Sequence, residues 1–163
     1  MAKKPDKAEK ENEGRKLIAT NRRAFHDYHV LEKYEAGIKL TGAEVKSLRA
    51  GHCVISDAHA TVDKKKSLAW LMNLQIPEWN RGNQIVAHEP KRKRALLLHK
   101  HEILKLRAEL QEQGLTLIPL SIYFKHGFAK VELGVCKGKK LYDKREALKE
   151  KQAKREIARR VKR

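Results

Sequence analysis

Residues 117–135 read LIPLSIYFKHGFAKVELGV, and this stretch decides the fold. Its first half, up to Phe124, is rich in large apolar side chains, and its second half, from Ala129, places an apolar residue at every second position. The tripeptide Lys125-His126-Gly127 between the halves has the composition of a hairpin turn. The pattern therefore predicts two antiparallel strands that are largely buried.

Three segments before this hairpin also have the pattern of strands. Residues 28–34 alternate Tyr, Val, Glu and Tyr at every second position, and residues 54–62 read as an extended segment. Residues 68–76 show the clearest two-residue alternation in the chain, which Pro77 ends. One face of this last strand is therefore expected to lie against the core.

Two segments have the pattern of helices. Thr41 and Glu44 have the spacing of a capping box, and Gly51 ends the short helix that they begin. A second helix is predicted over residues 96–110, because Leu96, Ile103, Leu106 and Leu110 follow helical spacing and Gly114 comes after them. Four consecutive cations at residues 91–94 precede this predicted helix.

Strands outnumber helices in this pattern, and their connections are short. The predicted fold is therefore mainly β with flanking helices, an OB-like antiparallel β-barrel. The length of 163 residues suits one domain, which we place at residues 17–136. Residues 1–16 mix Lys, Glu, Asn and Pro without periodicity and are expected to form a disordered leader.

Residues 137–163 form a basic tail. They contain 13 Lys and Arg against four Asp and Glu, which is half of the formal net charge of +18. Their few apolar side chains cannot bury a helix face, so we expect the tail to be disordered alone and helical when bound. Tyr142 is its one aromatic side chain, and a ring among cations suits a nucleobase surrounded by phosphates. The alternative is a solvated tail that improves solubility.

The charge of the whole chain indicates a polyanionic partner. Lys and Arg number 38 against 20 Asp and Glu, and the pI is about 10.0, which favours nucleic acid. A membrane is not expected as a partner, because no apolar run approaches ~20 residues and the N-terminus lacks the apolar core of a signal peptide. Cys53 and Cys136 form no CxxC pair and indicate reduced thiols in a cytoplasmic protein.

The sequence gives little support for metal binding or catalysis. His99 and His101 are two residues apart on a predicted helix and are expected to point to different sides, and no Cys lies at ligand spacing. There is no glycine-rich phosphate loop, and the carboxylates are scattered among cations. We therefore expect no cofactor, no metal and no enzymatic activity.

The cations at residues 91–94 would repel one another unless an anion sits there, so they are predicted to contact phosphate; the alternative is a solvated loop.

Four segments in the same order carry a resemblance to a known family. They are NRRAFHDY at 21–28, YEAGIKLTGAEVKSLRAG at 34–51, RALLLHKHEILKL at 94–106 and VCKGKKLYDKRE at 135–146. They closely resemble the SsrA-binding protein family, SmpB, and the resemblance runs over about residues 17–163. It implies a protein that binds the tRNA-like domain of transfer-messenger RNA and delivers it to stalled ribosomes for trans-translation. It also implies a tail that becomes helical in the empty mRNA channel, beside the decoding centre of the small subunit.

The resemblance and the cations together give the candidate site residues. By motif match, Asn21, Glu35 and Leu97 belong to the RNA-binding face. The cations predicted to meet phosphates of the same RNA are Arg22, Arg23, Arg92 and Arg94. The tail residues predicted to contact the ribosome are Lys139, Lys140, Tyr142, Asp143, Lys144, Arg145, Lys149, Lys154 and Arg155.

Some positions depart from the pattern associated with the family. Phe25 stands where Arg is usual, Ala95 where Lys is usual, and His52-Cys53 replaces a Lys-Ala type pair. The lost cations remove two phosphate contacts, although Phe25 could stack on a base.

The rival functions are a structural ribosomal or ribosome-assembly protein and, from another class, a nuclease or RNA-modifying enzyme. We expect a monomer.

Overall fold

The computed structural model describes residues 14–63, 67–81, 84–86, 88–111 and 114–140, together with Tyr142, Asp143, Lys149, Gln152 and Ile157. Its strands are β1 (Arg15–Thr20), β2 (Tyr28–Ile38), β3 (His59–Val62), β4 (Ala69–Met72), β5 (Trp79–Arg81), β6 (Gln84–Val86), β7 (Arg94–Leu97), β8 (Leu115–Lys125) and β9 (Phe128–Gly138). Its helices are α2 (Arg22–Asp27), α3 (Gly42–Arg49) and α4 (Lys100–Glu109).

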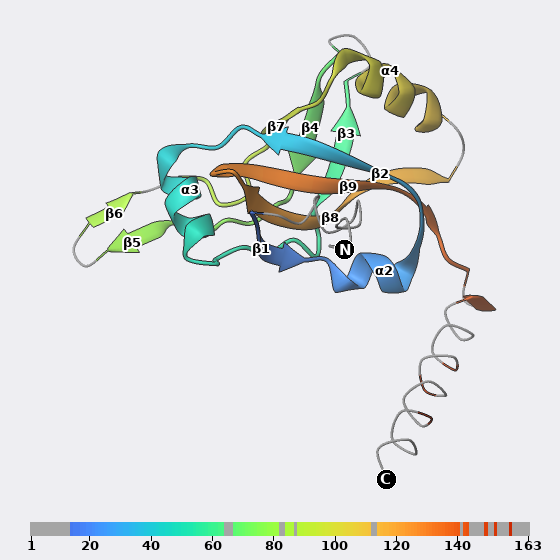
Figure 1. The fold of residues 1–163 in the computed structure, drawn as a ribbon, viewed down its shortest axis with the longest axis horizontal. Helices are drawn as coiled ribbons and strands as arrows, with labels where there is room; N and C mark the ends of the chain where they lie inside the picture. The colour runs from blue at the N-terminus through green and yellow to red at the C-terminus, as the bar shows by residue number, and fades with distance from the viewer. Residues whose placement is uncertain are drawn as a thin grey trace, which may run out of the picture.

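Seven of the strands form one antiparallel sheet in the order β1-β8-β3-β4-β7-β2-β9. Strand β8 also pairs with β9, so the sheet closes on itself (Figure 1). The predicted hairpin is the β8–β9 pair, and its turn uses positive φ angles at His126 (50°) and Gly127 (83°). The predicted mainly β, OB-like fold with flanking helices is confirmed.

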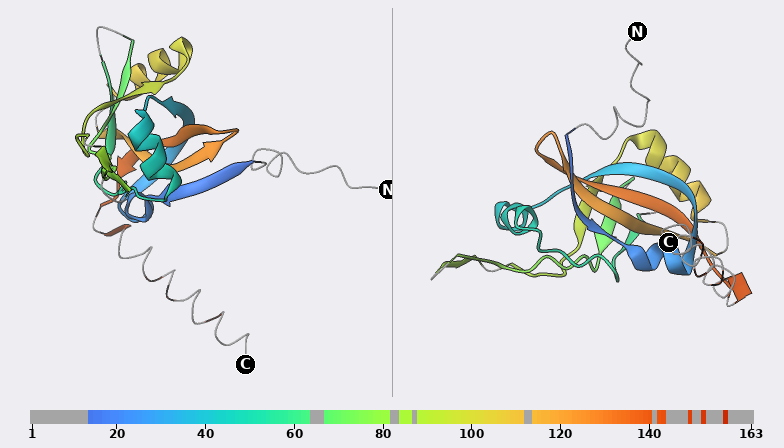
Figure 2. Two further views of the ribbon diagram at one scale, coloured as in Figure 1. Left: turned by 90° about the vertical axis from the view of Figure 1, so that its left-hand side faces the viewer. Right: turned by 60° about the horizontal axis from the view of Figure 1, so that its bottom comes forward.

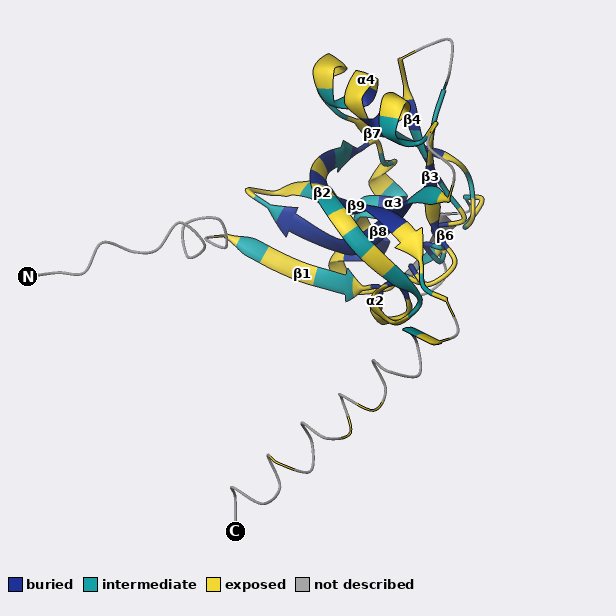
Figure 3. Ribbon diagram, turned by 90° about the vertical axis from the view of Figure 1, so that its right-hand side faces the viewer, coloured by how far each residue is buried: buried dark blue, intermediate teal, exposed yellow. Residues whose placement is uncertain are grey.

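The core lies inside this closed sheet (Figure 3). Leu71, Leu117 and Leu133 come from three different strands and are all fully buried. Helices α3 and α4 contribute Leu48 and Leu106 to the same cluster, because each helix turns one apolar side inward. Helix α2 covers a second, smaller cluster built from Ala24, Ile118, Leu120 and Cys136.

The second predicted helix was wrong at its beginning. Residues 94–97 form β7, and α4 begins only at Lys100, after the N-cap His99. The segment is extended because it lies between β2 and β4 and pairs with both. Arg94 and Leu96 point inward along it while Leu97 is exposed, so its alternation has the period of a strand. A pattern of only four residues does not distinguish a strand from the first turn of a helix.

Other boundaries also differ from the prediction. The strand predicted over 68–76 is interrupted at Asn73, whose φ is 56°, so β4 ends at Met72 and Gln75 makes only an isolated bridge to Val54. The capping box of Thr41 and Glu44 is present at α3. Strand β1 begins at Arg15, two residues before the predicted boundary, and residues 1–13 lie outside the described residues.

Strands β5 and β6 form a separate two-stranded sheet that extends away from the rest of the molecule (Figure 2). The chain leaves and re-enters the body near Ile76 and Pro90, where the Ile76 amide donates to the Pro90 carbonyl at 3.0 Å. Among the described residues, no helix is long and apolar enough to cross a membrane.

Candidate nucleic-acid interface

Asn21 holds helix α2 in place from inside the protein. It is 2% exposed, and its Oδ1 accepts the N-cap hydrogen bond from the Ala24 amide at 3.0 Å. Its Nδ2 donates to the carbonyls of Ile55 (3.3 Å) and Pro119 (3.1 Å). The structure therefore places Asn21 almost entirely below the surface, where it positions α2.

Replacing Asn21 with Ala is expected to lower the free energy of unfolding by about 0.5–2 kcal/mol, the range for a lost N-cap. Two buried carbonyls would lose a donor as well. Urea denaturation measures the change, and Arg22→Ala on the same helix is the matched control because Arg22 is exposed. An Asn21→Ala protein with unchanged stability but much weaker RNA binding would contradict the positioning role.

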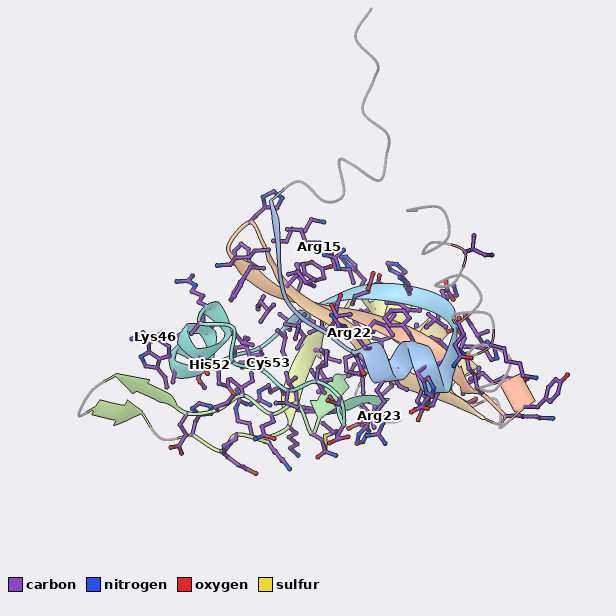
Figure 4. All side chains as sticks on the ribbon, turned by 90° about the horizontal axis from the view of Figure 1, so that it is seen from below. Arg15, Arg22, Arg23, Lys46, His52 and Cys53 are labelled. Carbon is purple, nitrogen blue, oxygen red and sulfur yellow. The ribbon has the colours of Figure 1, made fainter. Side chains whose placement is uncertain are left out.

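Arg22 and Arg23 project from α2 on the underside of the molecule (Figure 4). Both are exposed. Arg23 makes ion pairs with Asp57 at 3.1 Å and Asp27 at 3.5 Å, and the side chains of Arg23 and Asp57 are both well exposed. Pairs of this kind are weak in water, so both arginines remain able to meet a phosphate.

Arg94 is not on the surface. It is fully buried, and its guanidinium donates from Nε to Glu44 Oε1 (2.8 Å), from Nη1 to the Leu74 carbonyl (2.6 Å) and from Nη2 to the Pro90 carbonyl (3.0 Å). Arg92 approaches the same carboxylate, with Nε at 2.8 Å from Oε1 and Nη2 at 2.5 Å from Oε2. The anion beside this basic segment is therefore Glu44 of α3, and the predicted phosphate contact of Arg94 is not available.

Glu44 is ionised in this cluster. Burial favours its neutral form, but hydrogen bonds from Arg92 and the Thr41 amide and the charge of Arg94 outweigh burial and bring the pKa of Glu44 to about 2. The cluster ties α3 to β7 and to both ends of the segment that carries β5 and β6. Arg92 keeps 29% of its side chain exposed.

Glu35 and Leu97 line one groove, of about 660 Å³, on the outer face of the sheet. Leu97 is 61% exposed, and Phe128, at the start of β9, is 73% exposed beside the same groove. Gly37 of β2 pairs with Leu97 on one side and with Lys130 on the other. We call this the Leu97–Phe128 groove. It brings together two of the residues predicted by motif match, from strands far apart in the sequence.

A network of charges holds Glu35 at the edge of this groove. Its Oε2 accepts from the Tyr123 hydroxyl at 2.5 Å and from Lys125 Nζ at 3.4 Å, and Lys130 Nζ lies 3.6 Å from Oε1. Burial favours the neutral acid, but the Tyr123 hydrogen bond and the two lysine charges outweigh it and keep the pKa of Glu35 below its ordinary value. Glu35 is thus a fixed, ionised acceptor between cations.

The sequence did not single out several residues of this face. Arg15 places its guanidinium 3.6 Å from the centre of the Tyr123 ring and donates to Ser121 Oγ. Phe128 and Lys130 are two residues apart on β9, so alternation alone puts them on one face. The sequence pattern does not show which strand lies beside β9. The neighbouring strand is β2, about a hundred residues earlier in the sequence.

The start of the tail is attached to α2 and β2. The Lys139 amide donates to the Asp27 carbonyl at 2.9 Å, and Lys139 Nζ donates to the Phe25 carbonyl at 3.0 Å. Asp143 Oδ2 accepts from the Lys140 amide at 3.1 Å and lies 3.6 Å from His29 Nε2.

Only part of the predicted ribosome-binding set can be placed. Tyr142 is 68% exposed, Lys149 is exposed, and all five described residues beyond Lys140 have helical backbone. The other predicted tail residues, Lys144, Arg145, Lys154 and Arg155, lie outside the described residues. Disorder of the free tail stays a prediction.

The positions that depart from the expected pattern are now placed. Phe25 is 44% exposed on α2, Ala95 pairs with Trp70 of β4, and burial raises the pKa of the Cys53 thiol to about 11.

The rings of His99 and His101 stack with centroids 5.5 Å apart, so the expectation that they point to different sides was wrong; His99 is an N-cap rather than a helical residue. Within the described ranges, no group of three His, Cys, Asp or Glu side chains could hold a metal ion.

Comparisons with known proteins agree on one family. A family model described as SmpB protein matches residues 18–163. An SsrA-binding protein of Acidothermus cellulolyticus is 57% identical over 146 residues, which cover 90% of each chain. One of Carboxydothermus hydrogenoformans is 53% identical over 142 residues, covering 87% of this chain and 93% of the relative. A solved structure described as "tmRNA-SmpB: a journey to the center of the bacterial ribosome" is similar with a TM-score of 0.66 and 46% identity, covering 81% of this chain and 94% of that one.

Proposed function

The chain belongs to the SmpB protein family, and from this premise we propose that it is an RNA-binding adaptor for transfer-messenger RNA (SsrA) in trans-translation. It holds the tRNA-like domain of that RNA and delivers it to stalled ribosomes, so that incomplete peptides are tagged and the ribosomes are rescued. The chain performs no chemical step, because peptide-bond formation belongs to the ribosome. It acts in the cytoplasm, where ribosomes translate.

The observation that carries this proposal is the Leu97–Phe128 groove. Exposed apolar side chains beside a fixed carboxylate and two lysines can stack on a base, accept from its edge and meet its phosphates. Arg22 and Arg23 on α2 extend the cationic surface. Within this proposal Glu35 and Leu97 contact the RNA, whereas Asn21 and Arg94 hold the elements that present it.

The direct test is to purify the full chain from cells and sequence the RNA that stays bound to it. Strong enrichment of transfer-messenger RNA over ribosomal RNA is expected. Stoichiometric retention on salt-washed ribosomal subunits, without such enrichment, would instead favour a structural ribosomal protein. Cleavage or modification of structured RNA in a single-turnover assay would favour the enzymatic alternative.

RNA binding is expected to weaken steeply as salt concentration rises. Arg22, Arg23 and Lys130 exemplify the groups that displace counterions from phosphates, and about five such contacts give a slope of about −3.5 to −4.5 in a plot of log K against log salt. Fluorescence anisotropy with the tRNA-like domain measures the slope. Arg22→Ala should make it shallower by about 0.7–0.9, whereas a slope near zero for the unaltered protein would contradict the phosphate contacts.

A further inference from the structure

We propose that Lys139 is a positioning residue for the tail: by binding the C-terminal end of α2, it fixes the point from which the tail leaves the folded part of the chain. The inference rests on the proposed function, in which the tail acts at the decoding centre while the sheet holds the RNA. It assigns Lys139 to a contact within the protein, whereas the sequence predicted a contact with the ribosome.

Lys139 uses two donors on the last turn of α2. Its amide donates to the Asp27 carbonyl at 2.9 Å, and its Nζ donates to the Phe25 carbonyl at 3.0 Å. The carbonyls at the end of a helix have no amide partner within the helix, and a lysine side chain is one of the groups that can satisfy them. One residue therefore binds the end of α2 with both its backbone and its side chain, although it lies 114 residues after Phe25 in the sequence.

Helix α2 is a firm support for this contact. Asn21 caps the helix from below the surface, and Ala24 packs in the second apolar cluster. The ladder between β2 and β9 ends beside the same helix, because its last pair joins Tyr28 to Gly138 (Figure 1). Lys139 therefore extends the attachment of the chain beyond the sheet, onto an element that buried residues hold in place.

The first helical turn of the tail begins directly after this contact. The Lys140 amide donates to Asp143 Oδ2 at 3.1 Å, which is the spacing of the side chain that closes a capping box. The same oxygen lies 3.6 Å from His29 Nε2 of β2. Tyr142 and Asp143 have helical backbone, and Tyr142 is 68% exposed. The contact of Lys139 with α2 therefore sets where this turn starts and in which direction it presents Tyr142.

A fixed starting point matters because the tail and the bound RNA are attached to one folded body. A tethered group reaches its binding site with an effective concentration that depends on the length and stiffness of its tether. With Lys139 bound to α2, the tether begins at Lys140. Without this contact it would begin at the end of the ladder, and the first residues of the tail would sample more directions relative to the RNA. Loss of the contact should therefore slow the arrival of the tail at the decoding centre without weakening RNA binding.

The alternative role for Lys139 is a direct contact with a phosphate of ribosomal RNA. An ammonium group has three N–H donors, so Nζ has capacity for a partner besides the Phe25 carbonyl. The two roles differ in what they require of the free protein. Positioning needs ordered residues after Gly138 before any ribosome is present, whereas a phosphate contact adds one counterion to the salt dependence of ribosome binding.

Lys139→Met in the full chain tests the positioning role, because methionine keeps much of the apolar stem and loses the charged donor. NMR relaxation of the free wild-type protein should give backbone order parameters of about 0.85 at residues 139, 140 and 143, and the variant should give values below about 0.6. Tagging in a reconstituted translation system should slow about tenfold in the variant. Affinity for the tRNA-like domain should stay within about twofold.

Two further variants serve as matched controls. Lys137→Met removes the same charge from an exposed position near the end of β9, and it should leave the order parameters and the tagging rate unchanged. Lys139→Arg should restore most of the tagging rate, since a guanidinium can also donate to the Phe25 carbonyl.

Salt dependence separates the two roles of Lys139. If it positions the tail, the slope of log K against log salt for ribosome binding should be the same in Lys139→Met and Lys137→Met. A slope shallower by about 0.7–0.9 in Lys139→Met, with order parameters that stay high, would assign Lys139 to a phosphate and overturn the proposal. Low order parameters at residues 139–143 of the wild type, or normal tagging by Lys139→Met, would also overturn it and leave the adaptor function standing. Absence of binding between the wild-type chain and transfer-messenger RNA would instead overturn the proposed function.

Discussion

Replacing Arg94 with Met is expected to lower the free energy of unfolding by about 3–5 kcal/mol, which is the cost of removing one partner from a buried ion pair. Glu44 would remain charged and fully buried with only Arg92 and the Thr41 amide as partners. The Leu74 carbonyl would lose its Arg94 donor, and the Pro90 carbonyl would keep only the Ile76 amide. Urea denaturation at pH 7 measures the loss. Arg92→Met is the matched control and should cost less, because Arg92 is partly exposed and donates mainly to the same carboxylate.

The pH dependence of this variant separates the lost ion pair from a packing defect. The pKa of Glu44 falls from 4.5 to about 2 on folding, so its contribution is fully present above pH 4.5 and is lost as the pH falls toward 2. The stability gap between the wild-type protein and Arg94→Met should therefore narrow over that range. The double variant Glu44→Gln, Arg94→Met should recover part of the loss at pH 7. A gap that is independent of pH would show that lost packing, rather than the unpaired carboxylate, causes the destabilisation.

Ending the chain after Lys140 is expected to abolish peptide tagging on stalled ribosomes while changing RNA affinity by no more than about twofold, or under ~0.5 kcal/mol. The buried residues of β9 end at Cys136, and its pairing with β2 ends at Gly138, so the truncation leaves the whole sheet in place. The truncation keeps both hydrogen bonds of Lys139 to α2. Tagging in a reconstituted translation system and anisotropy with the tRNA-like domain give the two measurements.

The truncation also removes positive charge, so a second deletion tests whether lost charge alone explains the loss of tagging. Deleting residues 2–10 removes four lysines together with Asp6 and Glu9 from the other end of the chain, and should leave tagging intact. Replacing Asp143, Lys144 and Arg145 together with Ala should abolish tagging as fully as the truncation, because these residues are proposed to act at the decoding centre. If either tail variant tags peptides at the normal rate, the hypothesis that the folded part binds RNA while the tail senses the ribosome is wrong.

The parts of the fold that sequence predicted well are those in which local pattern and tertiary position agree. In β8 and β9 the apolar positions, the turn at His126 and Gly127 and the final pairing all indicate one hairpin. The capping box at Thr41 likewise depends only on residues within one turn. The prediction was wrong for β7, because Leu96 fits a helical spacing with Ile103. Only the pairing with β2 and β4 makes this segment extended.

The RNA-binding role of the candidate residues stays a prediction, and their surroundings in the fold were predicted only in part. Glu35 and Leu97 lie together as their shared motif assignment implies, yet nothing local reveals that Phe128 lies beside them. The basic segment was predicted to contact phosphate, but the anion that its two arginines contact is Glu44, fifty residues earlier in the sequence than Arg94. A charge pattern cannot tell an internal carboxylate from an external phosphate, since both satisfy a guanidinium equally well.

The pairing of β2 with β9 has a consequence for how the chain is made. Strand β2 ends at Ile38 and β9 begins at Phe128, so during synthesis one edge of β2 waits for the last strand of the sheet. At rates of about 5–20 residues per second this wait is about 5–20 seconds. An unpaired edge of eleven residues is a template for pairing with other chains during that time. Slow translation would therefore increase aggregation of the nascent protein, even though β9 covers this edge of β2 in the folded sheet.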